Sequence, residues 1–504
     1  MRDWLAHRAD STPEAPALCD GTGTVTTYGA LDGDVEELAG RLSAHGVGVD
    51  DHLGVVMETR PSFVEVVHAA MRVGATPVPL NARGTATELA ERLDLADVDC
   101  LLCESDTAEL AVEAAGTLDR ELPVAGVDGG TGGAADLLGT TPEAFEVPAI
   151  TIDGIELMLF TSGTTGRPKA VCLTAANLAA SAAASAFRLG LDPEDRWHVA
   201  LPMYHMGGLA PVYRSVLYGT SVLVEDTRGG FDPDHTVETI ESNGATCTSL
   251  VPTMLRRILD AREGNESPFP DSLRFVLLGG APASESLLEA CAERDVPVCP
   301  TYGMTETASG IATATPGEAR ERPGTVGSPL LFTEVTVVDR DGRAVPRGET
   351  GELVVAGPTL TPGYYGETAS TRAQFCSFGF RTGDVGYRDD AGRLYVLNRV
   401  DDRIVTGGEN VDPGEVLAVV KEAPGVSDAA VVGLPDEEWG QRVAALLVPD
   451  GEFDREAFDR YCRERLAGFK LPRTVREAEE IPRTASGTVD RAAVRERLGG
   501  GDRR

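Results

Sequence analysis

A short tract near residue 160 combines residue types that bind phosphate. In "MLFTSGTTGRPKAV" (Met158–Val171) an apolar run ends at a cluster of threonines, serine and glycines, and Lys169 follows. Inward-turned backbone N–H groups, hydroxyl donors and a positive charge suit phosphate oxygens. We therefore expect the tract to hold nucleotide phosphates rather than to be only a glycine-rich turn. Its members are Thr161, Ser162, Gly163, Thr164, Thr165, Gly166 and Lys169.

This tract is not a Walker A loop, which requires Gly-Lys followed by Ser or Thr. None of the three lysines, Lys169, Lys421 and Lys470, follows a glycine. The sequence also lacks the G-x-S-x-G elbow of hydrolases and the H-E-x-x-H zinc motif. The nucleotide must therefore be bound in another way.

Three downstream motifs carry further groups that suit a nucleotide. "LLGGAPAS" (277–284) ends an apolar run in a glycine turn, where the backbone can approach a flat ring closely. "TYGMTET" (301–307) supplies an aromatic face, a hydroxyl and a carboxylate, although Glu306 taken alone is equally typical of a helix start. "RTGDVGY" contains Asp384, whose carboxylate can accept hydrogen bonds from two ribose hydroxyls, and Arg399 follows.

The elements that must position these residues show an α/β pattern. From about residue 30 to about residue 300, helix-period segments such as 28–46 and 61–74 alternate with short apolar strands such as 52–57 and 75–81. This alternation indicates βαβ units and mostly parallel sheets covered by helices. From about residue 325 to about residue 400, short strands flank Asp-Gly and Ala-Gly turns, which indicates hairpins and a β-barrel-like section.

A smaller α+β pattern begins after Arg399. A strand, a glycine turn, a helix and two further strands precede an amphipathic helix. We predict a large N-terminal domain over residues 1–399, which carries the nucleotide-binding motifs, and a small C-terminal domain over residues 400–504. The apolar face of the last amphipathic helix consists of Ala457, Phe458, Tyr461, Cys462 and Leu466.

Taken together, "FTSGTTGRPKA", "GGAPAS", "YGMTET", "RTGD" and "NRVDDRI" with "GGEN" resemble the motifs of the adenylate-forming superfamily. This superfamily contains acyl-CoA synthetases, peptide-synthetase adenylation domains and luciferases. The resemblance implies a mobile C-terminal domain and the use of ATP, Mg²⁺ and coenzyme A. A carboxylate attacks the α-phosphate of ATP to give an acyl adenylate and pyrophosphate, and a thiol then displaces AMP.

The resemblance also implies roles for single residues. The Thr161–Lys169 tract holds the β- and γ-phosphates, Glu306 binds Mg²⁺ and Thr305 lies near the phosphates. Tyr302 stacks on adenine, Asp384 binds the ribose hydroxyls and Arg399 bridges ribose and phosphate. The remaining implied positions are the ATP-binding residues Gly280, Ala281, Pro282 and Gly303, the hinge residue Asp401, and Gly407, Gly408 and Glu409 on the face used for thioester formation.

The acid site is expected in "LPMYHMGGLAPVYRSVLYG", where a single arginine interrupts an apolar helix. A buried arginine costs desolvation free energy unless it is paired, so Arg214 needs a carboxylate partner. The partner is either an internal Asp or Glu or a second carboxylate on the substrate. His205, Gly207 and Arg214 are the predicted acid-binding residues, with His205 also a candidate for catalysis. Arg256 and Arg257 are competing clamps that would suit a malonate-like diacid.

Within the superfamily, "LPMYHMGGL", "SLVPTML" and "YGMTETAS" are most similar to the 2-succinylbenzoate–CoA ligases of menaquinone biosynthesis. In those ligases one carboxylate is activated while an aromatic carboxylate must be held, and Arg214 is the candidate clamp. The chain departs from them at Gly207-Gly208, where a serine usually stands. A CoA ligase for another aryl, fatty or dicarboxylic acid is the alternative.

The C-terminal motif "IPRTASGTVDR" (481–491) also departs from the superfamily, which has a catalytic lysine where this chain has Thr488. Arg483 or Arg491 takes over the charge, or the first half-reaction runs slowly without it, or the chain binds nucleotide and acid without turnover. Loss of one such charge contact typically costs about 3–4 kcal/mol. The sequence leaves these three hypotheses open.

Composition indicates the setting in which the protein works. There are 80 acidic residues against 45 basic ones, a formal net charge of −35, spread over the chain. We interpret this as a surface adapted to high salt, and the absence of a basic stripe disfavours nucleic-acid binding. No secretory signal or membrane-spanning run is seen, so a cytoplasmic enzyme is expected. Its partners are small molecules, and its oligomeric state stays open.

Overall fold

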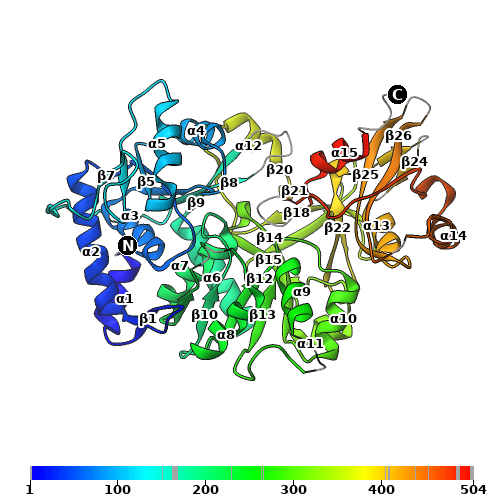
Figure 1. Cartoon of the computed structure of the whole chain (residues 1–504), viewed down its shortest axis with the longest axis horizontal. Coiled ribbons are helices and arrows are strands. Elements are labelled where there is room, and N and C mark those ends of the chain that lie inside the picture. The colour runs from blue at the N-terminus through cyan, green and yellow to red at the C-terminus, as the bar shows by residue number, and fades with distance from the viewer. Residues whose placement is uncertain are drawn as a thin grey trace. The chain divides into compact units, whose positions relative to one another are not determined.

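The computed structural model describes residues 3–149, 151–161, 168–226, 228, 230–262, 264, 266–402, 404–406, 409–411, 413–436, 439–451, 453–483 and 489–499. The chain folds into two compact units (Figure 1). The larger comprises residues 1–279, 285–334 and 355–380, and the smaller comprises 280–284, 335–354 and 381–504. Within the described residues, no helix is long and apolar enough to cross a bilayer.

A nine-stranded sheet is the centre of the larger unit, with a parallel middle and antiparallel edges. Its strands occur in the order β16 (Ser328–Pro329), β15 (Ser309–Thr313), β14 (Val298–Met304), β13 (Phe275–Leu278), β12 (Cys247–Leu250), β10 (Arg196–Val199), β11 (Ser221–Val224), β1 (Pro16–Asp20) and β2 (Val25–Thr27). The helices that alternate with them are α6 (Ala175–Leu189), α7 (Met206–Tyr218), α8 (Pro233–Ser242), α9 (Pro252–Ala261), α10 (Glu285–Glu293) and α11 (Pro316–Glu321). The predicted βαβ alternation is confirmed.

A second, five-stranded sheet of the larger unit is wholly parallel. Its order is β4 (Thr76–Pro79), β3 (His52–Val56), β5 (Cys100–Cys103), β6 (Val124–Gly126) and β7 (Ala135–Asp136). The N-terminal helices are α1 (Trp4–Ser11), α2 (Tyr28–Ala44), α3 (Pro61–Val73), α4 (Ala86–Leu95) and α5 (Ala108–Gly116). The helices and strands predicted over 28–46, 52–57, 61–74 and 75–81 are all present.

Three further strands of the larger unit form an antiparallel sheet that bears on the phosphate tract. β8 (Ile155–Thr161) pairs with β9 (Lys169–Thr174), and the two-residue β19 (Gly363–Tyr364) pairs with the other edge of β9. α12 (Thr368–Gln374) and β20 (Phe375–Cys376) follow. Residues more than 190 positions apart are thereby joined on β9, since Tyr364 lies opposite Val171.

The smaller unit contains the predicted hairpin section. Its strands are β17 (Glu334–Val338), β18 (Gly351–Ala356), β21 (Gly379–Arg388) and β22 (Leu394–Arg399), and β21 pairs antiparallel with β22. Gly392 has φ +86° in the turn between them, a conformation that favours glycine. The turn predicted at Ala391-Gly392 is therefore confirmed.

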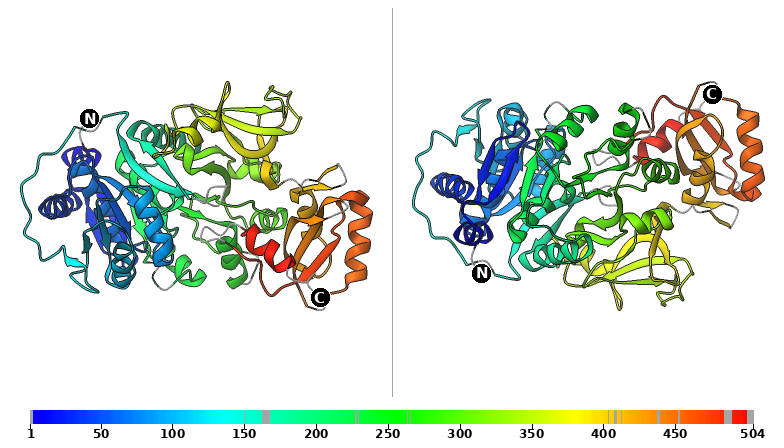
Figure 2. Two further views of the ribbon diagram at one scale, coloured as in Figure 1. Left: turned by 90° about the horizontal axis from the view of Figure 1, so that it is seen from above. Right: turned by 90° about the horizontal axis from the view of Figure 1, so that it is seen from below.

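The C-terminal part of the smaller unit is a sheet with helices on both faces (Figure 2). Alternate residues of β25 (Val426–Asp436) and β26 (Gly440–Pro449) face opposite ways. One set packs with α13 (Pro413–Lys421) and α14 (Arg455–Arg465), and the other packs with α15 (Arg491–Gly499). The predicted apolar face of the amphipathic helix is buried at Phe458 and Cys462. The elements are β23 (Ile404–Thr406), β24 (Glu409–Val411), α13 (Pro413–Lys421), β25 (Val426–Asp436), β26 (Gly440–Pro449), α14 (Arg455–Arg465), β27 (Thr474–Glu477) and α15 (Arg491–Gly499). The domain boundary proposed after residue 399 stays a prediction.

Candidate active site

The two ends of the phosphate tract belong to the paired strands β8 and β9, which the tract connects in the sequence. Thr161, the last residue of β8, lies opposite Lys169, the first residue of β9. The predicted phosphate-binding residues between these two ends lie outside the described residues. They are Ser162, Gly163, Thr164, Thr165 and Gly166.

Lys169 and Glu306, which the sequence predicts to share one nucleotide, are joined through Tyr364. The Lys169 ammonium lies 4.7 Å from the centroid of the Tyr364 ring. The Tyr364 hydroxyl donates a 2.9 Å hydrogen bond to Glu306 Oε1. Glu306 is only 7% exposed and Tyr364 only 8%, so both contacts are shielded from water. A cation, an aromatic ring and a carboxylate from three distant segments therefore form one cluster.

Tyr364 was not predicted from the sequence. Its backbone N–H donates to Thr371 Oγ1, and the nearby Thr361 N–H donates to the Glu306 carbonyl. These bonds fix the segment around β19 against the short helical turn Thr305–Thr307. A two-residue strand carries no periodic signal, and only the tyrosine pair in "PGYYGE" marks it.

The motif around Tyr302 is held by close strand pairing. Tyr302 and Gly303 lie in β14, whose residues pair antiparallel with β15. A Cβ at Gly303 would lie 2.0 Å from the Ser309 carbonyl oxygen, so the pairing itself requires glycine. Thr305 follows and is half-buried. The Gly280–Pro282 turn belongs to the smaller unit, where Gly280 has φ +77° and adopts the left-handed conformation of a glycine turn.

Asp384 and Arg399 form an ion pair in the smaller unit. They lie directly opposite each other on β21 and β22, and Arg399 Nη1 donates to Asp384 Oδ1 at 3.0 Å. A second guanidinium N–H donates to the Thr382 carbonyl at 3.2 Å. Asp384 is 8% exposed, and its pairing keeps a carboxylate and a cation together, as a ribose and phosphate site requires.

The implied hinge and thioester-face residues are only partly described. Asp401 is in a 3₁₀ turn and Glu409 begins β24, but the positions of their side chains lie outside the described part of the chain. Gly407 and Gly408 lie outside the described residues altogether. Their roles stay predictions.

His205 stands where the predicted acid-binding helix begins. It is the N-cap of α7, and its ring lies 4.5 Å from that of Tyr204. Burial lowers the pKa of His205 to about 4, so the imidazole is neutral at physiological pH. Its Nε2 is buried and has no hydrogen-bond partner among the described residues. A buried polar nitrogen of this kind fits a ligand that completes the site.

The two glycines after His205 play different parts. A Cβ at Gly208 would lie 2.3 Å from the Leu201 carbonyl oxygen, so the loop before α7 can fold over the first turn only at a glycine. Gly207 is exposed, and a Cβ there would meet only the tip of the Leu201 side chain, at 2.9 Å. The departure at Gly207 therefore changes the surface of the loop, whereas Gly208 is required by its path.

Arg214 is a buried cation with little pairing. It is 4% exposed, it donates one long hydrogen bond (3.4 Å) to Ser181 Oγ, and it lies 5.9 Å from the Trp197 ring centroid. No Asp or Glu of the described residues forms an ion pair with it, and burial lowers the pKa of its guanidinium. Helical side chains lean toward the N-terminus of their helix, so Arg214 leans toward the end of α7 that carries His205.

The competing arginines lie elsewhere. Arg256 and Arg257 are exposed on α9, and Arg257 donates to the Phe231 carbonyl at 3.1 Å while lying 5.0 Å from the Phe231 ring centroid. An exposed guanidinium keeps its hydration and needs no anionic partner, whereas a buried one needs an anion to offset its lost hydration. Of the three arginines, Arg214 has the greater need of a carboxylate.

The two arginines that might replace the missing C-terminal lysine are already paired. Arg483 Nη2 lies 2.7 Å from Asp428 Oδ2, and Arg491 Nη2 lies 3.0 Å from Asp402 Oδ2. Lys421 also lies 2.9 Å from Asp428 and contributes to lowering the pKa of that carboxyl against the opposing effect of burial. Thr488 itself lies outside the described residues.

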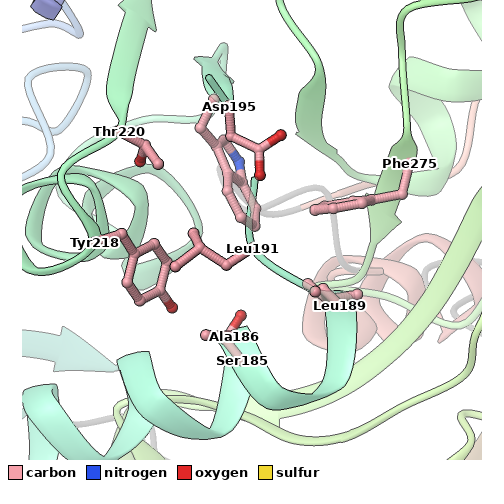
Figure 3. A pocket seen from close by; sticks show the side chains of 10 residues that line it. Ser185, Ala186, Leu189, Leu191, Asp195, Tyr218, Thr220 and Phe275 are labelled. Carbon is pink, nitrogen blue, oxygen red and sulfur yellow. The ribbon is translucent and has the colours of Figure 1, made fainter. Parts of the chain in front are cut away.

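One hollow in the larger unit is not part of this site (Figure 3). Asp195, Thr220 and Phe275 on its wall stand at the amino ends of parallel strands. Ligands of open α/β sheets bind at the carboxyl ends, where His205 and Gly279 lie. The remaining wall residues are Ser185, Ala186, Leu189, Gly190, Leu191, Trp197 and Tyr218.

Comparison with known proteins places the chain in one family. Residues 5–365 match the model of the AMP-binding enzymes, and residues 415–488 match the AMP-binding enzyme C-terminal domain. The 2-succinylbenzoate–CoA ligase of Bacillus licheniformis is 36% identical over 489 residues, which cover 97% of this chain and 98% of the relative. That of Bacillus cereus strain Q1 is 37% identical over 496 residues and 98% of each chain.

Solved structures agree with these relatives. The o-succinylbenzoate CoA synthetase of Bacillus subtilis in complex with its acyl-adenylate intermediate superposes with a TM-score of 0.89 at 35% identity, covering 98% of each chain. The same synthetase with ATP and magnesium ion gives a TM-score of 0.87 at 34% identity, covering 99% of each chain. ATP-bound MatB of Rhodopseudomonas palustris gives 0.89 at 28% identity over 98% of each chain. The predicted fold class and the resemblance to the adenylate-forming superfamily are confirmed.

Proposed function

Because the chain belongs to the family of AMP-binding enzymes, we propose that it is an ATP-dependent acid–CoA ligase whose acid is 2-succinylbenzoate. The succinyl carboxylate attacks the α-phosphate of ATP, pyrophosphate leaves, and the thiol of coenzyme A then displaces AMP from the acyl adenylate. In-line displacement at phosphorus depends on positioning and on neutralisation of charge more than on a protein base. Full-length relatives with this activity support the reaction class.

Arg214 is the observation that carries the choice of acid. A guanidinium that is 96% buried and lacks an ion pair among the described residues requires an anion to offset its desolvation. An aromatic carboxylate entering past His205 would supply that anion. The neutral imidazole adds no second charge that would compete with Arg214 for the carboxylate. A mono-acid would leave Arg214 unpaired.

The cluster of Lys169, Tyr364 and Glu306 is proposed to handle the phosphates. Glu306 is a buried oxygen ligand of the type that Mg²⁺ prefers in nucleotide sites. When bound, Mg²⁺ neutralises charge on the phosphate oxygens. Tyr364 orients the Glu306 carboxylate through its hydrogen bond, and Lys169 places a positive charge at the mouth of the phosphate tract. Asp384 and Arg399 are proposed to bind ribose and phosphate.

A pair of acids that differ by one carboxylate tests the proposal. The protein is incubated with ATP, Mg²⁺, coenzyme A and either 2-succinylbenzoate or 4-oxo-4-phenylbutanoate, which lacks the aromatic carboxylate, and pyrophosphate and thioester are followed. We expect 2-succinylbenzoate to be favoured at least 100-fold in kcat/KM. The Arg214→Met variant should lose this preference while its activity on 4-oxo-4-phenylbutanoate stays similar. Equal use of both acids by the wild type would refute the assignment of the acid.

A non-catalytic role is the second candidate, because Thr488 stands where the superfamily has a lysine and Arg483 and Arg491 are engaged with aspartates. In that case ATP would bind, as calorimetry can show, but neither pyrophosphate nor thioester would form with any acid. Turnover by the wild type excludes this candidate. A Thr488→Lys variant that gains more than tenfold in pyrophosphate release would identify slow adenylation instead.

We also propose that the protein works in a cytoplasm of high ionic strength. With a formal net charge of −35, the acidic side chains repel one another strongly at low salt. Salt screens this repulsion, since the Debye length falls to about 3 Å near 1 M. The midpoint of thermal unfolding should therefore rise between 0.1 M and 2 M KCl. A fall over that range would contradict this setting.

A further inference from the structure

The loop that presents His205 is tied to a residue far away in the chain. This acid-binding loop, residues 200–205, connects β10 to α7. The His205 N–H donates to the Pro202 carbonyl at 3.1 Å, and the His205 carbonyl accepts from the N–H groups of Gly208 and Leu209. Its internal bonds thus form a tight turn, and the turn decides where the imidazole stands.

Thr59 holds this turn with a single hydroxyl. Its Oγ1 accepts a 3.1 Å hydrogen bond from the Met203 N–H and donates a 3.2 Å hydrogen bond to the Leu201 carbonyl. Thr59 is 1% exposed and Met203 is fully buried, so water cannot replace the contact with the Met203 N–H. Only a hydroxyl donates and accepts through the same atom at this size.

Thr59 itself is fixed from the five-stranded sheet. Glu104 follows β5 and is 1% exposed; its Oε1 accepts from the Glu58 N–H at 2.8 Å, and its Oε2 accepts from Arg60 at 2.9 Å. Arg60 also bonds Asp128 at 2.8 Å. Both sequence neighbours of Thr59, Glu58 and Arg60, are therefore fixed by hydrogen bonds to Glu104. These bonds position the Thr59 hydroxyl against the acid-binding loop.

From this geometry we infer that Thr59 is a positioning residue for acid recognition, acting through the Leu201–Met203 backbone on His205. The inference rests on the proposed function, in which His205 borders the acid. Loss of the hydroxyl leaves the Met203 N–H and the Leu201 carbonyl without this partner, and the turn relaxes to find others. The acid then meets a displaced imidazole, while no hydrogen bond among the described residues joins Thr59 to the phosphate cluster of Lys169, Tyr364 and Glu306.

Two substitutions at Thr59 separate the hydroxyl from the shape of the side chain. Thr59→Val keeps the shape and removes both hydrogen bonds, and Thr59→Ser keeps the hydroxyl. We expect Thr59→Val to raise KM for the acid about tenfold or more, with KM for ATP within twofold of the wild type. Thr59→Ser should stay within threefold for both. Thr236→Val is the matched control, because Thr236 is fully buried on α8 and its hydroxyl bonds the Glu225 carboxylate rather than the loop.

A merely structural role predicts a different result. Thr59→Val and Thr236→Val would then lower the unfolding midpoint alike and leave the ratio of the two KM values unchanged, and that result would overturn the inference. So would equal effects of Thr59→Val and Thr59→Ser. The ring nitrogen NMR signals of histidine, with that of His205 assigned through His205→Gln, give a second readout. Thr59→Val should move the His205 signal and Thr59→Ser should not.

The NMR readout also separates this inference from the proposed function. If the wild type forms no thioester with any acid, the proposed function fails, but the His205 signal still reports whether Thr59 positions the loop. A signal unchanged in Thr59→Val would refute the positioning role in either case.

Discussion

Tyr364 makes two contacts that can be removed one at a time. Tyr364→Phe keeps the ring beneath Lys169 and deletes the hydroxyl that donates to Glu306 Oε1 at 2.9 Å. Tyr364→Leu deletes both contacts. The ring contacts Lys169 and the hydroxyl contacts Glu306. The effects of the two variants on catalysis should therefore differ in kind as well as in size.

The magnitudes follow from burial and charge. A hydrogen bond to a charged group is worth roughly 1.5–3 kcal/mol, and Glu306 at 7% exposure cannot recover it from water. If Tyr364 orients the carboxylate for the reaction, Tyr364→Phe should lower kcat/KM for ATP by about 10-fold to about 150-fold, since 1.4 kcal/mol is a factor of ten. A cation–π contact adds about 0.5–2 kcal/mol, so Tyr364→Leu should lose a further factor of about 2 to about 30.

The assay measures kcat/KM for ATP at several Mg²⁺ concentrations, together with calorimetric binding of ATP in the presence of Mg²⁺. Tyr364→Phe should require more Mg²⁺ to reach half-maximal rate, since the ligand it affects is Glu306. Tyr365→Phe is the matched control, because the Tyr365 hydroxyl donates to the exposed Asp97 at 3.0 Å. A Tyr364→Phe variant that matches the control in both kcat/KM and Mg²⁺ requirement would refute the reasoning.

Three further perturbations test the site and its surroundings. Lys169→Gln should lower kcat by about 10²–10³-fold through loss of a charge contact, whereas Lys421→Gln, which removes a lysine paired with Asp428, should leave kcat within threefold. Asp384→Asn should raise KM for ATP about tenfold in steady-state kinetics with a small change in the unfolding midpoint, because its partner Arg399 is 36% exposed and the ion pair is partly solvated. Burial raises the pKa of Glu156 from 4.5 to about 7. Between pH 4.5 and pH 7 the folded state therefore holds a proton that the unfolded state releases, and the folded state loses stability as the pH rises through this range. Glu156→Gln should therefore raise the free energy of unfolding by about 3 kcal/mol at pH 8 and hardly at all at pH 4.5, as urea titrations at the two pH values would show.

The fold could be predicted from the sequence because its signals are local. Helix-period and strand-period segments gave α2, β3, α3 and β4 with nearly the observed bounds, and the Ala-Gly turn gave the β21–β22 hairpin. In the same way Asp384 and Arg399, fifteen positions apart, fall opposite each other because a hairpin fixes the register of its two strands. Where the decisive contact lies within one hairpin, the spacing in the sequence predicts the geometry.

The reacting groups of the candidate site could be predicted from the sequence, but the residues that position them could not. Lys169 and His205 are recognisable because each interrupts or ends a glycine-rich or apolar tract, whereas Glu306 was identified only through the superfamily motif that contains it. The identity of Arg214 as a buried cation without an ion pair among the described residues could not be read from α7 alone, since any strand facing that helix could have supplied a carboxylate. The structure was needed to show which groups those strands present.

The residues that position the site were missed for one physical reason. Tyr364 bonds Glu306 across 58 positions, and Thr59 bonds Leu201 and Met203 across 142 and 144 positions. Each sits in a segment too short for a periodic pattern, and its importance lies wholly in a partner that only the folded chain brings near. A reacting group must be chemically unusual and is therefore visible in a sequence, whereas a positioning group need only be an ordinary tyrosine or threonine in the right place. The conservative variants at Tyr364 and Thr59 are for that reason the most informative substitutions in this protein, since they alter placement while leaving every reacting group intact.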